Sequence, residues 1–242
     1  MLLKFVRLFF YILWVVMACM IGIIAGILRP FSAKNTRLTS RIINSGHPIL
    51  GIKVELRNKS GLEHRPCVFI SNHQDNLDII PGCHTVPHDT VTIGKRDILY
   101  IPFFGLFYWL AGNILINRGN KKSAFGTMDQ TAAQIRERKI SVWIMPEGTR
   151  SRGRGILPFK KGPFITAIKA QVPVVPVAIS SYISHLDLTK WNAGKILIEV
   201  LPPIQTLGLE AGEATLIKDR AYEMIVEAVA RLDRELDSAI KK

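Results

Sequence analysis

The sequence is poor in residues that could form disulfides or a metal site. Its 242 residues include only three cysteines, Cys19, Cys67 and Cys83, odd in number and far apart in the chain. This spacing argues against a disulfide framework and suits a reducing compartment. The six histidines show no paired spacing of the kind that zinc ligands have. We therefore expect no bound metal and no other cofactor.

Several catalytic signatures are also missing. No G-x-S-x-G turn, P-loop or dinucleotide fingerprint occurs in the chain, which disfavours a covalent serine mechanism and nucleotide hydrolysis. There is no internal repeat, low-complexity segment or interdomain linker. A chain of this length holds one large domain, or one domain with an appendage.

Acidic residues are scarce beside basic ones. The chain has 19 acidic residues and 32 lysines and arginines, which gives a formal net charge of +13. This balance implies an anionic partner, which is nucleic acid, a membrane surface or a phosphorylated substrate. Nucleic acid is the least favoured of the three. The basic residues are dispersed, no reading module is recognisable, and the Gly/Arg run at 151–155 is short and lacks aromatic residues.

The N-terminus carries the longest apolar run, Leu8–Leu28. About 20 apolar residues can cross a bilayer as a helix. A cleaved secretory signal is disfavoured, because the run exceeds the usual length and no small-x-small site precedes Arg29-Pro30. Membrane attachment is therefore predicted. Basic residues on both sides of the run set no clear orientation, so spanning the bilayer and lying in one leaflet both stay open.

Two features refine this N-terminal segment. Gly22 and Gly26 indicate either close packing or a helix break. Ser32–Ile43 is basic, with apolar residues at helical spacing, and fits an amphipathic helix at the headgroup level or an ordinary surface helix. We predict membrane-anchoring helices over residues 1–45 and an α/β domain over residues 46–242.

The rest of the chain alternates between strand-like and helical patterns. The expected strands are Ile49–Leu56, Val68–Ser71, Thr90–Gly94, Ile140–Met145, Val174–Ser180 and Ile196–Leu201. The expected helical segments are Asp97–Leu110, Lys121–Arg138, Gly162–Ala170 and Ala214–Ile240. This alternation predicts an α/β fold with a largely parallel or mixed sheet flanked by helices. Pro173 and Pro176 indicate an edge, a strand start or a pocket wall at the fifth strand, because proline cannot donate to a ladder.

A polar stretch, Asn72–Asp78, directly follows the buried strand that ends at Ser71. His73 can accept a proton near neutral pH, and a carboxylate on its other ring nitrogen would fix the tautomer and stabilise the cation. His73 and Asp78 are five residues apart, so they cannot share a helical face. They can meet if His73 lies in a turn and Asp78 starts the next helix. The alternative is a polar loop whose Asp or Asn caps that helix.

Basic residues lie beside apolar runs at Lys95 and Arg118. A cation at such a place suits a phosphate monoester, although each alone also fits a solvated charge at the end of an element. Because ligands of open α/β sheets bind beyond the carboxyl ends of strands, the position of Lys95 after a predicted strand favours binding.

A third polar motif, Glu147-Gly148-Thr149-Arg150, follows the strand predicted at Ile140–Met145. Gly148 lets main-chain N–H groups approach a ligand. Arg150 could bind a phosphate. Glu147 could accept a hydrogen bond from a substrate hydroxyl, or it could position Arg150. The alternative is a turn with an internal Glu–Arg pair.

Taken in order, these motifs resemble the four sequence blocks of the 1-acylglycerol-3-phosphate acyltransferases, also called lysophosphatidic acid acyltransferases. The resemblance covers nearly the whole chain and is closest to bacterial members. The corresponding blocks are Asn72–Asp78, Gly94–Arg118, Pro146–Gly153 and Val172–Val177. Some bacterial members have Asp before the arginine of the second block, where this chain has Asn117. Asp75 also gives His73 a second nearby carboxylate, so the orienting role of Asp78 is implied by the family.

The resemblance implies acyl transfer from a thioester, on coenzyme A or acyl carrier protein, to the 2-hydroxyl of lysophosphatidic acid. It gives His73 and Asp78 catalytic roles. It gives substrate-binding roles to Lys95, Arg118, Glu147, Gly148, Thr149 and Arg150. It also implies the bacterial inner membrane, with the site facing the cytoplasm. The alternatives are a relative that acylates another lysolipid or glycerol 3-phosphate, and a non-catalytic tether to anionic lipid.

Overall fold

The computed structural model of the chain describes residues 1–117 and 121–240. Its centre is a seven-stranded sheet with the order β1-β7-β6-β2-β5-β3-β4. The strands are β1 Ile52–Arg57, β2 Val68–Ser71, β3 Thr90–Lys95, β4 Ile114–Ile116, β5 Ser141–Ile144, β6 Val174–Ile179 and β7 Gly194–Val200. The pairing of β6 with β7 is antiparallel and the other pairings are parallel. The predicted α/β class with a mixed sheet is confirmed.

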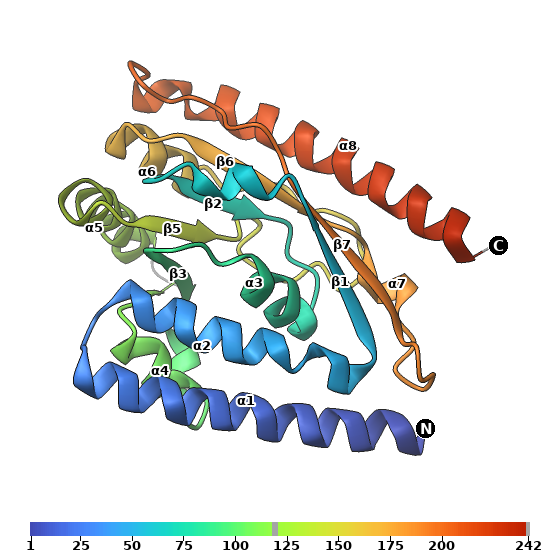
Figure 1. Ribbon diagram of the computed structural model, residues 1–242. Helices are drawn as coiled ribbons and strands as arrows, with labels where there is room; N and C mark the ends of the chain where they lie inside the picture. Colours follow the sequence, from blue (N-terminus) through green and yellow to red (C-terminus); the bar gives the residue numbers. More distant parts are fainter. Residues whose placement is uncertain (118–120, 241–242) are drawn as a thin grey trace.

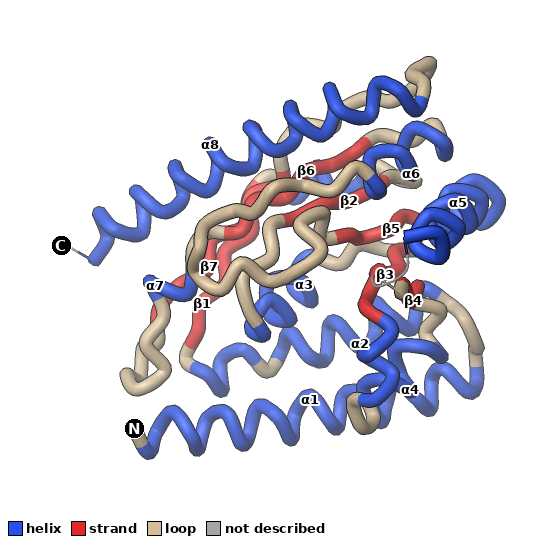
Figure 2. The backbone as a smooth tube through the Cα atoms, turned by 180° about the vertical axis from the view of Figure 1, so that it is seen from behind, coloured by secondary structure: helices blue, strands red, loops and turns tan. Residues whose placement is uncertain are grey.

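Helices cover both faces of this sheet (Figure 1). The α-helices are α1 Leu2–Leu28, α2 Ala33–Ser45, α3 Ile79–Thr85, α4 Phe104–Leu110, α5 Lys121–Arg138, α6 Gly162–Ala170, α7 Tyr182–His185 and α8 Ala214–Ile240. Short 3₁₀ turns lie at His47–Leu50, Lys59–Glu63, Asn76–Asp78, Arg96–Tyr100 and Ala211–Glu213. Figure 2 shows the same layers from behind, with helices in blue and strands in red.

The alternation of side chains along the strands builds two cores. In β2, Val68 and Ile70 point to the side covered by α5, α6 and α8, whereas Phe69 points to the side covered by α2 and α3. In β5, Val142 and Trp143 divide between the same two cores. All these side chains are 4% exposed or less. A parallel sheet buried on both faces needs continuous apolar strands, and these short runs supply them.

One predicted strand has the wrong start, and one strand was not predicted. Residues 47–50 form a 3₁₀ turn and β1 begins only at Ile52, because Gly51 adopts a left-handed conformation with φ +70°. β4 is a three-residue strand that periodicity cannot detect.

Of the alternatives predicted for Pro173 and Pro176, the strand start is confirmed for Pro173, because β6 begins at the next residue, whereas the edge strand is wrong. β6 lies between β2 and β7, in the interior of the sheet. Pro176 is tolerated there because β7 has already ended at Val200, and Leu201 donates its N–H to the Pro176 carbonyl just beyond that end. The valines of this strand are fully buried core residues.

The N-terminal helix lies along the domain. In Figure 1, α1 runs side by side with α2, on the far side of α2 from the sheet. Gly22 allows the approach of α1 to α2, and Gly26 allows its approach to α4. A Cβ on Gly22 would lie 2.4 Å from Thr39 Oγ1, and one on Gly26 would lie 2.7 Å from Leu110 Cβ. The glycines therefore mark close packing of an unbroken helix. The division of the chain at residue 45 stays a prediction.

Candidate active site

The imidazole of His73 and the carboxylate of Asp78 meet at the carboxyl end of β2. Nδ1 of His73 lies 2.5 Å from Oδ2 of Asp78. The chain leaves β2 at Ser71, turns through His73 and enters α3 directly after Asp78. The pair therefore meets in the way that the five-residue spacing requires, with the histidine in the turn and the aspartate at the helix start. Asp78 is 4% exposed and the side chain of His73 is 15% exposed.

The second carboxylate in this loop, Asp75, has a different task. Its Oδ1 accepts the N–H of Asn76 at 2.6 Å and so caps the turn that leads into α3. Asp78 Oδ2 accepts the main-chain N–H groups of Gln74 at 2.7 Å and Asp75 at 3.1 Å. These bonds fix the carboxylate against the imidazole, and the sequence alone could not separate the two aspartates.

Side-chain amides tie this loop to the neighbouring strand β6. Asn72 donates to the Ile179 carbonyl at 2.8 Å and accepts the Ile179 N–H at 2.9 Å, as a strand residue would. Gln74 Nε2 donates to the Ser180 carbonyl at 2.8 Å. Both amides are buried, so their hydrogen bonds cannot be exchanged for water without cost.

Glu147 ties the same loop to the turn after β5. Its Oε1 accepts the N–H of His73 at 2.6 Å, and its Oε2 accepts the N–H of Leu157 at 2.9 Å. Ser151 and Arg152 add main-chain bonds to the carbonyls of His73 and Gln74. The structure shows no ion pair between Glu147 and Arg150, both of which it describes, so the predicted alternative of an internal Glu–Arg pair is wrong.

The carboxyl group of Glu147 is buried, and burial changes its pKa. The residue is 3% exposed. Burial raises the pKa of Glu147 above its ordinary value, although the N–H groups of Leu157 and His73 act in the opposite direction. The buried carboxylate thus depends on two main-chain donors for its charge.

Two of the three predicted phosphate-binding residues, Lys95 and Arg150, lie at or beyond the ends of strands at the same edge of the sheet. β2, β5 and β3 are parallel neighbours, so their carboxyl ends meet there. Lys95 ends β3 and pairs with Asp97, with both side chains more than half exposed. Arg150 and Thr149 are exposed on the turn whose next residue, Ser151, bonds to His73. Arg118 lies outside the described residues.

Gly148 is placed as the sequence predicts, in a turn with φ +71°. A Cβ at this position would lie 2.7 Å from Nζ of Lys160. Lys160 therefore brings a further cation against the turn, although no separate role was predicted for it. The turn and the strand end are joined because the Lys160 N–H bonds to the Pro146 carbonyl at 2.9 Å.

Sequence reasoning missed one residue of this site entirely. Tyr182, the first residue of α7, is 1% exposed and donates its hydroxyl to Oδ1 of Asp78 at 3.0 Å. It lies 104 positions from Asp78 in the chain. A lone tyrosine after a strand carries no local signal of such a contact.

The arrangement is that of a general base. The carboxylate engages Nδ1 of His73, so Nε2 is the nitrogen that would receive a proton from a hydroxyl. The described residues include no group of three or more His, Cys, Asp or Glu side chains that could hold a metal ion. An α/β sheet with a His–Asp pair and cations at one edge thus defines an enzyme suited to acyl transfer onto a phosphorylated acceptor.

Known proteins place the chain within one family. The sequence model described as "Acyltransferase" matches residues 53–180. The chain is 36% identical to the 1-acyl-sn-glycerol-3-phosphate acyltransferase of Haemophilus influenzae, over 97% of this chain and 98% of that protein. The Escherichia coli protein of the same name is 36% identical over 95% and 94%. The human alpha form is 33% identical over 89% and 77%. The chain belongs to the acyltransferase family.

A solved structure shares the fold. The crystal structure of the 1-acyl-sn-glycerophosphate (LPA) acyltransferase PlsC from Thermotoga maritima superposes with a TM-score of 0.74 at 20% identity. The match covers 96% of this chain and 95% of that one. The similarity extends over the N-terminal helices as well as the sheet, so the fold is shared along nearly the whole chain.

Proposed function

We propose that this protein transfers an acyl group from a thioester to the 2-hydroxyl of 1-acylglycerol 3-phosphate, forming phosphatidic acid. The observation that carries the proposal is the 2.5 Å contact between His73 and Asp78 at the carboxyl end of β2. Relatives with this activity in their names, 36% identical over nearly the whole chain, support the choice of substrate.

The reaction is a proton transfer coupled to an addition. Nε2 of His73 removes the proton of the 2-hydroxyl while its oxygen attacks the thioester carbonyl. Asp78 stabilises the imidazolium that forms. The carbonyl π-electrons move to oxygen, giving a tetrahedral oxyanion that main-chain N–H groups would stabilise. When the oxyanion collapses, the C–S bond breaks and the ester remains. The sulfur leaves with the bonding electrons and takes the proton from Nε2 of His73, so a thiol is released and the imidazole is neutral again.

Binding of the acceptor phosphate is assigned to the cations at this edge. We propose that Lys95 and Arg150 hold the phosphate, together with Arg118, and that Gly148 and Thr149 shape the turn around it. A guanidinium can bind two phosphate oxygens at once, which fixes the orientation of the 2-hydroxyl. The contact between Glu147 and the glycerol stays a prediction. Both carboxylate oxygens of Glu147 already accept main-chain N–H groups.

The acyl donor is coenzyme A or acyl carrier protein in this proposal, and no other cofactor takes part. Both donors carry negative charge, which suits the formal charge of +13. The turn from Arg150 to Gly155 adds further exposed basic residues beside His73.

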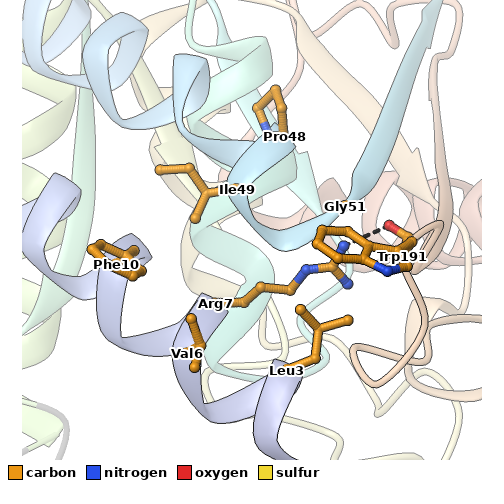
Figure 3. A pocket seen from close by; sticks show the side chains of 8 residues that line it. All are labelled: Leu3, Val6, Arg7, Phe10, Pro48, Ile49, Gly51 and Trp191. Carbon is orange, nitrogen blue, oxygen red and sulfur yellow. Dashed lines mark hydrogen bonds between the residues drawn. The ribbon is translucent and has the colours of Figure 1, made fainter.

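Membrane attachment is proposed through α1, lying in one leaflet. α1 is the one described helix with the length and hydropathy to cross a bilayer. Both of its ends are nevertheless held by the domain. Near the N-terminus, Arg7 donates to main-chain carbonyls of the loop before β7, one of them Trp191 at 2.5 Å (Figure 3). Near the C-terminus, Gly26 packs on Leu110.

The other side of α1 is apolar and exposed. Its exposed large side chains include Phe5, Phe9, Ile12, Leu13, Met20, Ile24 and Ile27. The neighbouring segment with α4 adds Tyr100, Ile101, Phe103, Leu106 and Trp109. A helix with one face buried in its own domain and the other apolar fits the membrane plane. The proposed site of action is the cytoplasmic face of a bacterial inner membrane, where thioester donors are available.

The test uses membranes or detergent-solubilised protein with lysophosphatidic acid and a labelled acyl donor. We expect label in phosphatidic acid from the wild type and a loss of about 10²–10⁴-fold in His73→Ala, the usual range for a general base. His64→Ala, at an exposed histidine, is the matched control and should keep activity. Full label transfer by His73→Ala would refute the assignment. Competition with other lysolipids and glycerol 3-phosphate identifies the acceptor.

A further inference from the structure

A buried tyrosine outside the four sequence blocks touches the catalytic pair. Tyr182 follows β6, whose carboxyl end is next to that of β2. Its ring is 1% exposed and its hydroxyl donates to Asp78 Oδ1 at 3.0 Å. The contact joins α7 to the loop that carries the dyad.

The two oxygens of Asp78 are held from different parts of the fold. Oδ2 accepts the N–H groups of Gln74 and Asp75, which belong to the same loop as Asp78, and faces the ring of His73. Oδ1 accepts from Tyr182, on α7. A carboxylate held at both oxygens cannot rotate about its Cβ–Cγ bond, so its plane toward the imidazole is fixed.

We infer that Tyr182 is a positioning residue for the dyad, whose hydroxyl fixes the plane of the Asp78 carboxylate and moderates its pull on the His73 proton. The kinetic consequence rests on the proposed function, whereas the effect on the His73 ring does not. A hydrogen bond to a charged acceptor is among the stronger ones in proteins. Without it, the negative charge of Asp78 would act more strongly on the imidazole.

The surroundings keep Tyr182 in its role as a neutral donor. Burial, and after it the charge of Asp78, raises the pKa of Tyr182 above its ordinary value. Among the described carboxyl groups, Asp78 contacts the His73 ring, Glu147 accepts the His73 main-chain N–H from the turn after β5, and Asp75 lies in the same loop and acts on Tyr182. Asp78 is the carboxylate in direct contact with the ring. A phenol that shares its charge is therefore expected to change the pH at which His73 takes up its proton.

α7 is in turn held by the C-terminal helix α8. The N–H of Ser181 donates to Asp233 Oδ1 at 2.7 Å. His185 lies between the Ser181 carbonyl, 2.6 Å from Nδ1, and Asp237, 3.0 Å from Nε2. These contacts fix both ends of the short helix. The position of the Tyr182 hydroxyl therefore does not depend on Asp78 alone.

The test compares Tyr182→Phe with the wild type as full-length protein in detergent micelles. With ¹⁵N-labelled histidine, the ring shifts of His73 give the pH at which the ring takes up its proton. We expect this midpoint to rise by about 0.5 pH unit or more, because a donor to a charged group is lost. The acid limb of the pH profile of kcat/KM should also shift to higher pH. We expect kcat to fall about 3- to 10-fold and the acceptor KM to change by less than about two-fold.

Two further arms keep the test decisive. Tyr222→Phe removes a hydroxyl that donates to the Ile156 carbonyl at 3.2 Å and should leave the His73 midpoint unchanged. 3-Fluorotyrosine at position 182 keeps the hydroxyl but is a stronger donor, so it should lower the midpoint. This arm decides the question if Tyr182→Phe fails to fold by thermal unfolding. A midpoint that is unchanged or lower in Tyr182→Phe, or not lowered by fluorotyrosine, overturns the inference. Activity retained in His73→Ala would overturn only the proposed function.

Discussion

At the residue scale, the orientation of the imidazole depends on a carboxylate that is itself heavily restrained. Asp78 accepts from two main-chain N–H groups and one phenol while facing His73. Such a carboxylate can stabilise an imidazolium without moving, and a fixed charge costs no reorganisation when the proton is transferred. The many hydrogen bonds between the loop Asn72–Asp78 and its neighbours supply this restraint.

The Asp78→Asn variant is predicted to lose about 10²-fold or more in kcat with a smaller change in the acceptor KM, because an amide cannot stabilise the imidazolium. Steady-state kinetics with lysophosphatidic acid measure both. Asp75→Asn is the matched control, since Asp75 caps a turn, and it should lose less than about ten-fold. Equal losses in the two variants would contradict the assignment of Asp78.

Glu147 gives the protein a pH-dependent stability term. Its pKa is raised in the folded state by burial, so the fold favours the protonated form. The stability that this group contributes is therefore fully present below its unfolded pKa of about 4.3 and is lost as the pH rises through the folded value. We predict that the stability of the wild type relative to Glu147→Gln falls between pH 4 and pH 7. Thermal unfolding of both proteins in detergent over this range measures it, and parallel curves would be evidence against it.

The contact between His73 and Asp78 was predictable from the sequence because both residues lie within one loop. His73 and Asp78 are close in the chain, and a strand followed by a helix start brings them together. Tyr182, Asn72 and Lys160 were not assigned roles, because their partners lie across the sheet edge and depend on tertiary packing. The choice between Asp75 and Asp78 likewise needed the main-chain N–H groups that only the folded loop positions.

At the element scale, the helices α5, α6 and α8 have the bounds that the sequence predicts, since their apolar periodicity and flanking residues are strong signals. β4 has three residues and the first strand begins after a left-handed glycine, so local pattern failed at both. An edge position was one of the alternatives predicted for β6, and it was wrong because the rule on proline concerns only a missing donor. The structure satisfies that rule by ending the neighbouring strand early.

The close packing of α1 makes a prediction for its glycines. In Gly26→Ala, the new Cβ would lie 2.7 Å from Leu110 Cβ, and overpacking of this kind typically costs about 1–3 kcal/mol. We expect the unfolding temperature to fall by about 2–10 °C for a chain of this size. Gly126→Ala in α5 is the control, because nothing lies within 4 Å of the new Cβ, and it should be neutral or stabilising by up to about 1 kcal/mol. A stabilised Gly26→Ala would contradict the packing of α1 on α4.

At the scale of the whole molecule, the apolar surface and the catalytic edge belong to one rigid arrangement. α1 packs on α2, and α2 packs on α3, the helix that begins directly after Asp78. The His73–Asp78 pair is therefore connected to α1 through two layers of packed side chains. In the proposed one-leaflet placement of α1, this arrangement would keep the site at a constant height above the bilayer surface, which suits an enzyme whose acceptor and product are lipids.

A helix held in one leaflet has both ends on the same side of the membrane. Leu2 and Leu28 are both more than 70% exposed, so Leu2→Cys and Leu28→Cys can each report their side with a membrane-impermeant thiol reagent. We predict that both label in inverted inner-membrane vesicles and that neither labels in intact cells. The wild type, whose own cysteines are buried or half-buried, gives the background, and Glu210→Cys on the exposed loop before α8 marks the cytoplasmic side. A helix of 27 residues is about 40 Å long, enough to cross. Labelling of the two ends from opposite sides would therefore show that α1 leaves the domain and spans the bilayer.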